Sequence, residues 1–226
     1  MFDLFGTLTD PLANSSRPRH LVELAACIGA SPHKLARALV DSLPHRLTNP
    51  ASTRDVLTEI INRDLGLPVQ PSTLDRAVRM RLEHARSLHT LRPDAVFVLG
   101  RLRDRRNRIA VVSDCSSETA ELWDEMPLAP CVDARVLSCE MGRRKPSPGL
   151  YRRACDLLEV PPQECWYVGD GGSRELTGAQ RVGMRPVLLA DPDDDGRFRL
   201  EPERDWHGPR VDRLDQLLHL VVDGSA

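Results

Sequence analysis

Between about residue 10 and residue 92, apolar residues recur every three or four positions, and no segment alternates as a strand does. This spacing places the apolar side chains on one face of a helix. Four helices are predicted, because a capping residue or a proline stands at the start of each apolar run. They begin near Pro18, Ser31, Ser52 and Pro71, and the last reaches towards His89. The segment is expected to form a small helical bundle.

After Pro93, helices and short apolar runs alternate. The predicted strands are residues 109–112, 134–137, 165–168 and 186–189. The predicted helices lie near residues 96–102, 118–125, 149–159 and 174–182, and a last short strand and helix are predicted within residues 211–222. Continuous apolar strands separated by helices indicate a parallel sheet with helices on both faces. The predicted fold class is therefore α/β.

The two patterns divide the chain into an α/β core and an α-helical insert. The core is predicted to comprise residues 1–12 and 91–226, and the insert residues 13–90. Only Met1 and Phe2 precede Asp3, whereas a buried strand normally has about 5–6 residues. Either the first strand is a stub, or the natural start of the protein lies upstream.

Composition and charge narrow the range of partners. The 226 residues carry a formal net charge of -2, which gives no reason to expect nucleic acid or an anionic membrane as a partner. No apolar run reaches the ~18–20 residues of a membrane span, and no signal segment is visible, so a cytoplasmic location is expected. The six cysteines are scattered, so free thiols are expected rather than a zinc site or disulfides. Oligomeric state is left open.

Polar side chains of complementary type follow four of the predicted strands. They are Asp3, Ser113, Lys145 and Asp170. In a parallel sheet these strand ends lie along one edge, so the four side chains are expected to share a crevice. A nucleophilic carboxylate, a hydroxyl, a cation and a second carboxylate suit phosphoryl transfer, with Asp3 forming an aspartyl-phosphate.

The two carboxylates also predict a metal ion. Asp3, Asp170 and a phosphate would repel one another unless a hard cation lay between them, and Mg²⁺ usually binds such oxygens. Lys145 and Ser113 would bind the remaining phosphate oxygens and stabilise the transition state. The expected partner is therefore a small anionic, phosphorylated substrate.

The order of these segments resembles the haloacid dehalogenase-like (HAD) hydrolase superfamily. The run DLFGTL at residues 3–8 is similar to its first motif, and the second to fourth motifs correspond to Ser113, Lys145-Pro146, and Gly169-Asp170 with Glu175. The insert stands where the superfamily carries its type I helical cap. The resemblance implies a Rossmann-like core and hydrolysis through an aspartyl intermediate. It also implies Mg²⁺ held by Asp3, the Phe5 backbone carbonyl and Asp170.

Two further acids are assigned to the site. Asp114 joins Ser113 and Lys145 in the expected substrate-binding set, and it could equally cap the helix that follows. Glu175 is expected to support the metal site from behind its ligands, through a bound water or another side chain. Tyr151 is expected to pack rather than to take part in the chemistry.

Phe5 departs from the family pattern. HAD phosphatases usually have a second Asp there, which protonates the leaving group, and a phenyl ring cannot transfer a proton. Three interpretations are open: a phosphatase that uses a good leaving group or an acid from the cap, a metal-independent 2-haloacid dehalogenase, and a weakly active or ligand-binding protein. Gly169-Asp170 favours the Mg²⁺-dependent phosphatase. The histidines that could replace the acid are His20, His33, His45, His84 and His89.

Overall fold

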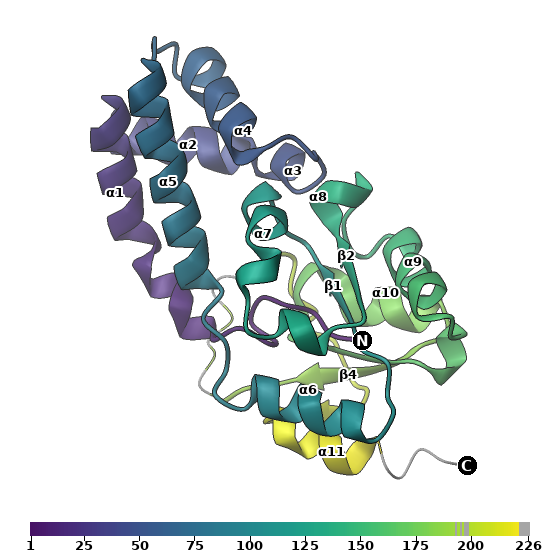
Figure 1. Ribbon diagram of the computed structural model, residues 1–226. Helices are drawn as coiled ribbons and strands as arrows, with labels where there is room; N and C mark the ends of the chain where they lie inside the picture. Colours follow the sequence, from purple (N-terminus) through teal and green to yellow (C-terminus); the bar gives the residue numbers. More distant parts are fainter. Residues whose placement is uncertain (193, 195, 197–198, 222–226) are drawn as a thin grey trace.

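The computed structural model describes residues 1–192, 194, 196 and 199–221, apart from the side chains of residues 14–16. Its centre is a parallel sheet (Figure 1). Strand β1 pairs with β2, while β4 pairs with both β3 and β5, and every pair is parallel. The strands are β1 (Ala110–Ser113), β2 (Ala134–Leu137), β3 (Trp166–Gly169), β4 (Arg185–Leu189) and β5 (Arg210–Val211).

The first predicted strand joins the two halves of the sheet. Phe2 forms parallel bridges to Val111 of β1 and to Val168 of β3. Its N–H donates to the Ala110 carbonyl at 2.9 Å, and its carbonyl accepts from the Val112 N–H at 2.8 Å. The strand is reduced to this bridge, and the order across the sheet is β2, β1, Phe2, β3, β4, β5. The next residue, Asp3, therefore stands at the centre of the sheet.

Helices cover both faces of the sheet, because successive side chains of a strand point to opposite sides. Val111 packs with α6 (Ala95–Asp104) and α11 (Leu217–Leu220) on one face. Ala110 and Val112 pack with α9 (Pro148–Leu158) and α10 (Glu175–Arg181) on the other. The α/β fold class is confirmed.

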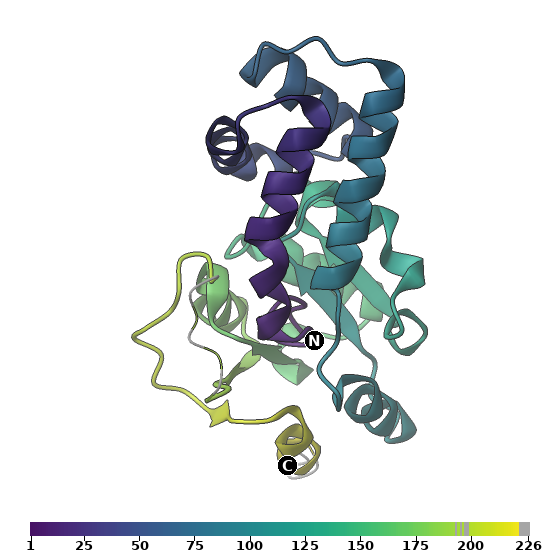
Figure 2. The same cartoon turned by 90° about the vertical axis from the view of Figure 1, so that its left-hand side faces the viewer.

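The helices of residues 17–88 have a hydrophobic core of their own. Buried apolar residues from Leu24 to Ala77 pack together there, separately from the residues that cover the sheet. Helices α1 and α5 lie side by side in both views (Figures 1 and 2). The α4 helix continues as a π-helical turn, Ile60–Asp64. The helices are α1 (Arg17–Ile28), α2 (Pro32–Asp41), α3 (Leu43–Arg46), α4 (Thr53–Glu59) and α5 (Pro71–Leu88).

This helical group meets the rest of the molecule through α5 and α7 (Ser117–Glu121). Arg81 of α5 forms an ion pair with Glu118 of α7, and both side chains are largely buried. The segments that enter and leave this helical group run side by side, with an antiparallel bridge between Thr9 and Leu91. The insert is thus tied to the sheet by a double connection and by a charged contact.

Most elements lie close to their predicted bounds, and β2 coincides with its prediction. One helix was predicted at residues 118–125, but α7 ends at Glu121 and a 3-10 turn follows. The helices α3 and α8 (Ser138–Met141) were not predicted, because one turn is too short to show a period. Residue 222, in the last predicted helix, lies outside the described residues. Short 3-10 helices are Pro11–Ser16, Trp123–Glu125, Ala129–Cys131, Pro162–Glu164, Gly172–Arg174 and Leu214–Gln216.

The structure also bears on two expectations from the sequence, which concern the cysteines and membrane-spanning segments. All six cysteines are free thiols, as their spacing predicted. Within the part of the chain that the structure describes, no helix has the length and apolar character needed to cross a bilayer.

Candidate active site

Asp3 is buried at the end of the central strand stub, with 4 % of its surface exposed. Its N–H donates to the Val168 carbonyl at 2.9 Å, which fixes the backbone against β3. The chain then reverses in a tight turn, where the N–H groups of Leu8 and Thr9 both donate to the Leu4 carbonyl. The turn carries the chain away from the sheet and leaves the Asp3 carboxylate on a cavity.

Lys145 brings the positive charge of the site. Its Nζ lies 2.5 Å from Asp3 Oδ1 and 2.5 Å from Glu175 Oε2. Burial by itself lowers the pKa of Lys145, but the carboxylates of Asp3 and Glu175 outweigh it and hold that pKa well above its ordinary value. Lys145 therefore stays charged and orients the Asp3 carboxylate.

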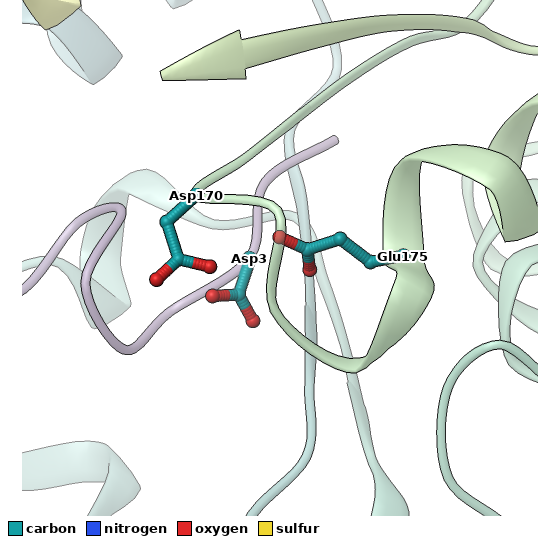
Figure 3. Close-up of side chains that lie close together, drawn as sticks. All are labelled: Asp3, Asp170 and Glu175. Carbon is teal, nitrogen blue, oxygen red and sulfur yellow. The ribbon is translucent and has the colours of Figure 1, made fainter. Parts of the chain in front are cut away.

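A second carboxylate, Asp170, faces Asp3 from the turn after β3, and Glu175 points towards both from the start of α10 (Figure 3). One oxygen from each of the three acids lies within 4.8 Å of the others. Burial raises the pKa of Asp3 to about 6, with Lys145 opposing the rise and Asp170 adding to it. Three acids at this spacing favour a cation among them.

Both oxygens of Glu175 accept hydrogen bonds inside the protein. Oε1 accepts from the Gly171 N–H at 3.1 Å, and Oε2 accepts from the Tyr167 hydroxyl at 2.9 Å as well as from Lys145. Burial raises the pKa of Glu175 well above its ordinary value, and the charge of Asp3 adds to the rise. Glu175 therefore holds the Lys145 ammonium group beside Asp3.

Tyr151 supports this arrangement from below. Its ring is fully buried, and its hydroxyl donates to the backbone carbonyl of Glu175 at 3.0 Å. The contact fixes the first turn of α10, so Tyr151 has the packing position that the sequence suggested.

Oxygen acceptors remain available for a metal ion beside Asp3. Asp3 Oδ2 accepts a long contact from the Thr7 hydroxyl, at 3.4 Å. Among the described residues, no N–H donates to the Phe5 carbonyl. Asp170 Oδ1 accepts a hydrogen bond from the Gly172 N–H at 2.8 Å, and Asp170 Oδ2 accepts one from Arg199 Nε at 3.1 Å. Carboxylate and carbonyl oxygens are the ligands that Mg²⁺ prefers, so these residues fit that ion.

Ser113 and Asp114, at the end of β1, each hold an unsatisfied oxygen. Ser113 Oγ and Asp114 Oδ2 are buried, and neither has a hydrogen-bond partner in the described part of the chain. Asp114 Oδ1 accepts from the backbone N–H of Lys145 at 2.9 Å. The possible capping role of Asp114 is wrong, because the next helix has Ser116 at its N-cap. Buried oxygens without partners are costly, and a bound substrate could satisfy them.

A cavity of about 560 Å³ opens in front of these residues. The ends of the central strands contribute Asp3, Asp114 and Asp170, and the loop between α8 and α9 contributes Lys145. Phe5 lines the cavity beside them. The helical insert supplies the opposite wall, with the side chains Arg17, His20, Arg46, Arg81, His84 and His89. Three of the five histidines proposed as replacement acids thus reach the cavity. Ser113 is fully buried next to Asp114, at the end of β1.

The structure adds residues that sequence reasoning did not assign. Arg199, from the segment after β4, pairs with Asp170 and lines the cavity. Arg46 and Arg81 come from helices of the insert, where their arginines look like an ordinary polar face. Only the packing of the insert over the strand ends brings them to the site, so the sequence carried no signal for them.

Gly6 provides a test of how the turn and the metal site depend on each other. Its φ is 77°, and a Cβ there would lie 2.5 Å from Asp170 Oδ2. Gly6→Ala is expected to cost about 1–2 kcal/mol of stability for the left-handed backbone. Because Asp170 must move, a Mg²⁺ ion held by that residue would bind more weakly, and any activity that depends on the ion would need more of it. Chemical denaturation and metal titration measure the two effects.

Gly29→Ala is the matched control for Gly6→Ala. Gly29 has a φ of 72° after α1, but nothing lies within 4 Å of its Cβ position. The control should lose similar stability and keep the metal dependence of the wild type. Equal metal titrations for the two variants would contradict the coupling between Gly6 and Asp170.

Comparison with known proteins places the chain in a family. A model of the haloacid dehalogenase-like hydrolase family matches residues 1–183. The chain belongs to this family of hydrolases. It is 26% identical to the glyceraldehyde 3-phosphate phosphatase of Methanopyrus kandleri, over 98% of this chain and 95% of that protein. It is 28% identical to the N-acylneuraminate-9-phosphatase of Rattus norvegicus, over 48% of this chain and 42% of that protein.

Solved structures share the fold of this HAD hydrolase. A HAD phosphatase from Thermococcus onnurineus aligns with a TM-score of 0.66 at 20% identity, over 97% of this chain and 95% of the other. A 2-haloacid dehalogenase from Pseudomonas syringae pv. Tomato DC3000 aligns with a TM-score of 0.69 at 18% identity, over 98% and 96%. At these identities the likeness establishes a common architecture, and both activities occur on it.

Proposed function

We propose that this protein is a Mg²⁺-dependent phosphatase that acts on a small phosphorylated metabolite through an aspartyl-phosphate on Asp3. The observation that carries the proposal is Asp170, a second carboxylate facing Asp3 beside Lys145. A nucleophilic carboxylate that attacks carbon gains nothing from a second anion at its side, whereas a phosphoryl site uses one to hold a metal. The full-length similarity to the Methanopyrus kandleri phosphatase supports the same class of reaction.

The side chains can be given roles in this reaction. Asp3 Oδ2 attacks phosphorus, the bond to the leaving oxygen breaks, and solvent water protonates the departing alkoxide because Phe5 cannot. Lys145 and the Ser113 hydroxyl donate hydrogen bonds to the phosphoryl oxygens. Asp114 Oδ2 accepts from a substrate hydroxyl. Water then hydrolyses the aspartyl-phosphate, which releases inorganic phosphate and restores the Asp3 carboxylate.

Bound at Asp3, Asp170 and the Phe5 carbonyl, Mg²⁺ would neutralise the charge gathered there and polarise the phosphoryl group. Lys145 holds Asp3 Oδ1 at 2.5 Å, which orients the carboxylate for the attack of Oδ2 on phosphorus. Arg199, which pairs with Asp170 Oδ2, would share that residue with the ion.

The helical insert has a role in this proposal as a cap. Residues 13–90 would form the cap domain and residues 1–12 and 91–226 the core, with the cavity between them. A cap that closes over the substrate would contribute to the choice of substrate. The double connection at Thr9 and Leu91 is where such a movement would pivot.

Phe5 supports a second candidate function, a 2-haloacid dehalogenase. A halide leaving group needs no proton, so an aromatic residue at this position is no handicap to that reaction. In this case Asp3 would attack carbon without a metal. Phe5 is also compatible with a protein that binds a ligand with little turnover, because such a protein needs no acid at this position.

The deciding experiment is hydrolysis of p-nitrophenyl phosphate with Mg²⁺ and then with excess chelator. Its leaving group departs without protonation, so Phe5 does not mask a competent nucleophile. We expect turnover that disappears with chelator and returns when Mg²⁺ is added in excess. Turnover that persists in chelator would contradict the metal requirement. No turnover in either condition, together with halide release from 2-chloropropionate, would establish the second candidate instead.

A further inference from the structure

The wall of the cavity opposite Asp3 carries a concentration of positive charge. Arg17, Arg46 and Arg81 all line it, and Glu118 is the acid that lies among them. Glu118 is paired with Arg81. Burial opposes the ionisation of Glu118, but Arg81 outweighs that effect and lowers its pKa to about 2. The ion pair of Glu118 on this wall is thus with Arg81.

Among the described residues, the charge of Arg46 has no ion-pair partner. Its side chain is 8% exposed, at the end of α3. Nε donates to the Ser42 hydroxyl at 3.2 Å and Nη2 to the Leu39 carbonyl at 2.8 Å, both neutral acceptors. In the described part of the chain, no carboxylate lies within ion-pair distance of it. These two bonds hold the guanidinium in a fixed direction and leave its charge unpaired.

A buried, unpaired guanidinium is expensive, because its hydration is lost and no opposite charge replaces it. Burial lowers the pKa of Arg46 to about 10, and the charge of Arg81 contributes to the shift. The two stacked histidines on the same wall respond in the same direction. Burial lowers the pKa of His20 to about 4, with Arg81 adding to it, so His20 is neutral at pH 7. The wall is thus a region of positive potential, and a bound anion would be stabilised there by these charges.

We propose that Arg46, with Arg17 and Arg81 beside it, binds a second anionic group of the substrate, at the far end from the phosphate that Asp3 attacks. The substrate class would then be phosphate monoesters that carry a carboxylate or another phosphate. The inference rests on the proposed phosphatase function, because it assigns the two ends of one cavity to two ends of one molecule. A planar guanidinium suits either anion, since both accept paired hydrogen bonds from its fork.

The test compares substrates that differ only at the far end. Phosphate monoesters of ω-hydroxy acids, with two to six carbons, are set against their primary amides and against the alkane bisphosphates of matching length. We expect the wild type to prefer the charged substrate over the amide by about 10- to 100-fold in kcat/KM at one chain length, as charged hydrogen bonds allow. Preference for the acids assigns a carboxylate to the cavity, and preference for the bisphosphates assigns a phosphate.

Arg46→Met then tests the residue. The ratio of kcat/KM for the charged substrate to that for the amide should fall towards one, and any loss common to both substrates cancels in the ratio. Arg37→Met is the matched control, because Arg37 lies on α2, outside the cavity, and pairs with Asp41 on the surface. The control should keep the wild-type ratio. Arg46→Lys, which retains a charge but not the fork, is expected to give an intermediate ratio.

The outcomes separate this inference from the function on which it rests. If the wild type hydrolyses p-nitrophenyl phosphate with Mg²⁺ but shows no preference for a charged far end at any chain length, the second anion site is wrong and the phosphatase stands. An unchanged ratio in a folded Arg46→Met protein would likewise overturn the role of Arg46. Absence of Mg²⁺-dependent hydrolysis would overturn the proposed phosphatase function itself.

Discussion

Replacing Asp3 by asparagine is expected to lower kcat for p-nitrophenyl phosphate by about 10⁴- to 10⁶-fold, the loss typical when a covalent nucleophile is removed. An amide has the same shape but cannot displace an alcohol from phosphorus. The variant should fold, because the asparagine side chain still offers an oxygen to Lys145 and because one of three close negative charges disappears. Steady-state kinetics and a thermal melt measure the two expectations.

Asp10→Asn is the matched control for this substitution. Asp10 lies in the same segment, and its Oδ1 accepts from the Leu12 N–H at 2.8 Å, which an amide oxygen can also do. The control should keep the activity of the wild type. A second readout is a rapid acid quench, in which intact mass should reveal one phosphoryl group on the wild type and none on Asp3→Asn. Activity of Asp3→Asn within tenfold of the wild type would rule out Asp3 as the nucleophile.

The sheet and the site residues on it could be predicted because the signals are local and repeated. Asp3, Ser113 and Asp170 each follow a short apolar run, and parallel strands must bring those ends together. Lys145 lies further along the chain, in the loop between α8 and α9. Asp3, Lys145 and Asp170 are therefore found in one place, although 142 positions separate Asp3 from Lys145 in the chain. The strand before Asp3 was the weakest part of this pattern. It is a single bridging residue, Phe2, held by its neighbours on both sides.

The opposite wall of the cavity could not be predicted for a physical reason. Helical periodicity indicates which face of a helix is buried, but not which surface that face meets. Arg46 comes from a single-turn helix without a period, and Arg81 meets Glu118 only because α5 packs against α7. The sequence placed Glu175 behind the metal ligands, but its donors Lys145, Tyr167 and the Gly171 N–H come from separate segments and could not be read from a local pattern. Contacts between elements thus decide what local patterns leave undetermined.

Phe5→Asp is expected to raise kcat/KM for simple alkyl phosphates by about 10²-fold or more, because general acid catalysis typically contributes about 10²–10⁴-fold. Phe5 lines the cavity with Asp3 and Asp170. The charges of those acids would raise the pKa of the new carboxyl, so that a part of it stays protonated near neutral pH and can donate to the leaving oxygen. His89, whose ring centre lies 5.8 Å from that of Phe5, is held neutral because burial lowers its pKa to about 4. A neutral His89 would not form an ion pair with the new carboxylate, whereas a charged imidazolium would do so and lower the pKa of that group.

The slope of log kcat against the pKa of the leaving alcohol distinguishes this gain from any general change in the site. The wild type should show a steep dependence, with p-nitrophenyl phosphate far better than alkyl phosphates, and Phe5→Asp should flatten it. Phe5→Asn is the matched control, because it removes the same partly buried ring and has no proton to transfer. Both variants should lose similar stability, so a denaturation curve shows whether the comparison is fair. A slope that the two substitutions change equally would mean that the ring blocks the site rather than that an acid is missing, and Phe5 would then be a steric feature of the substrate cavity.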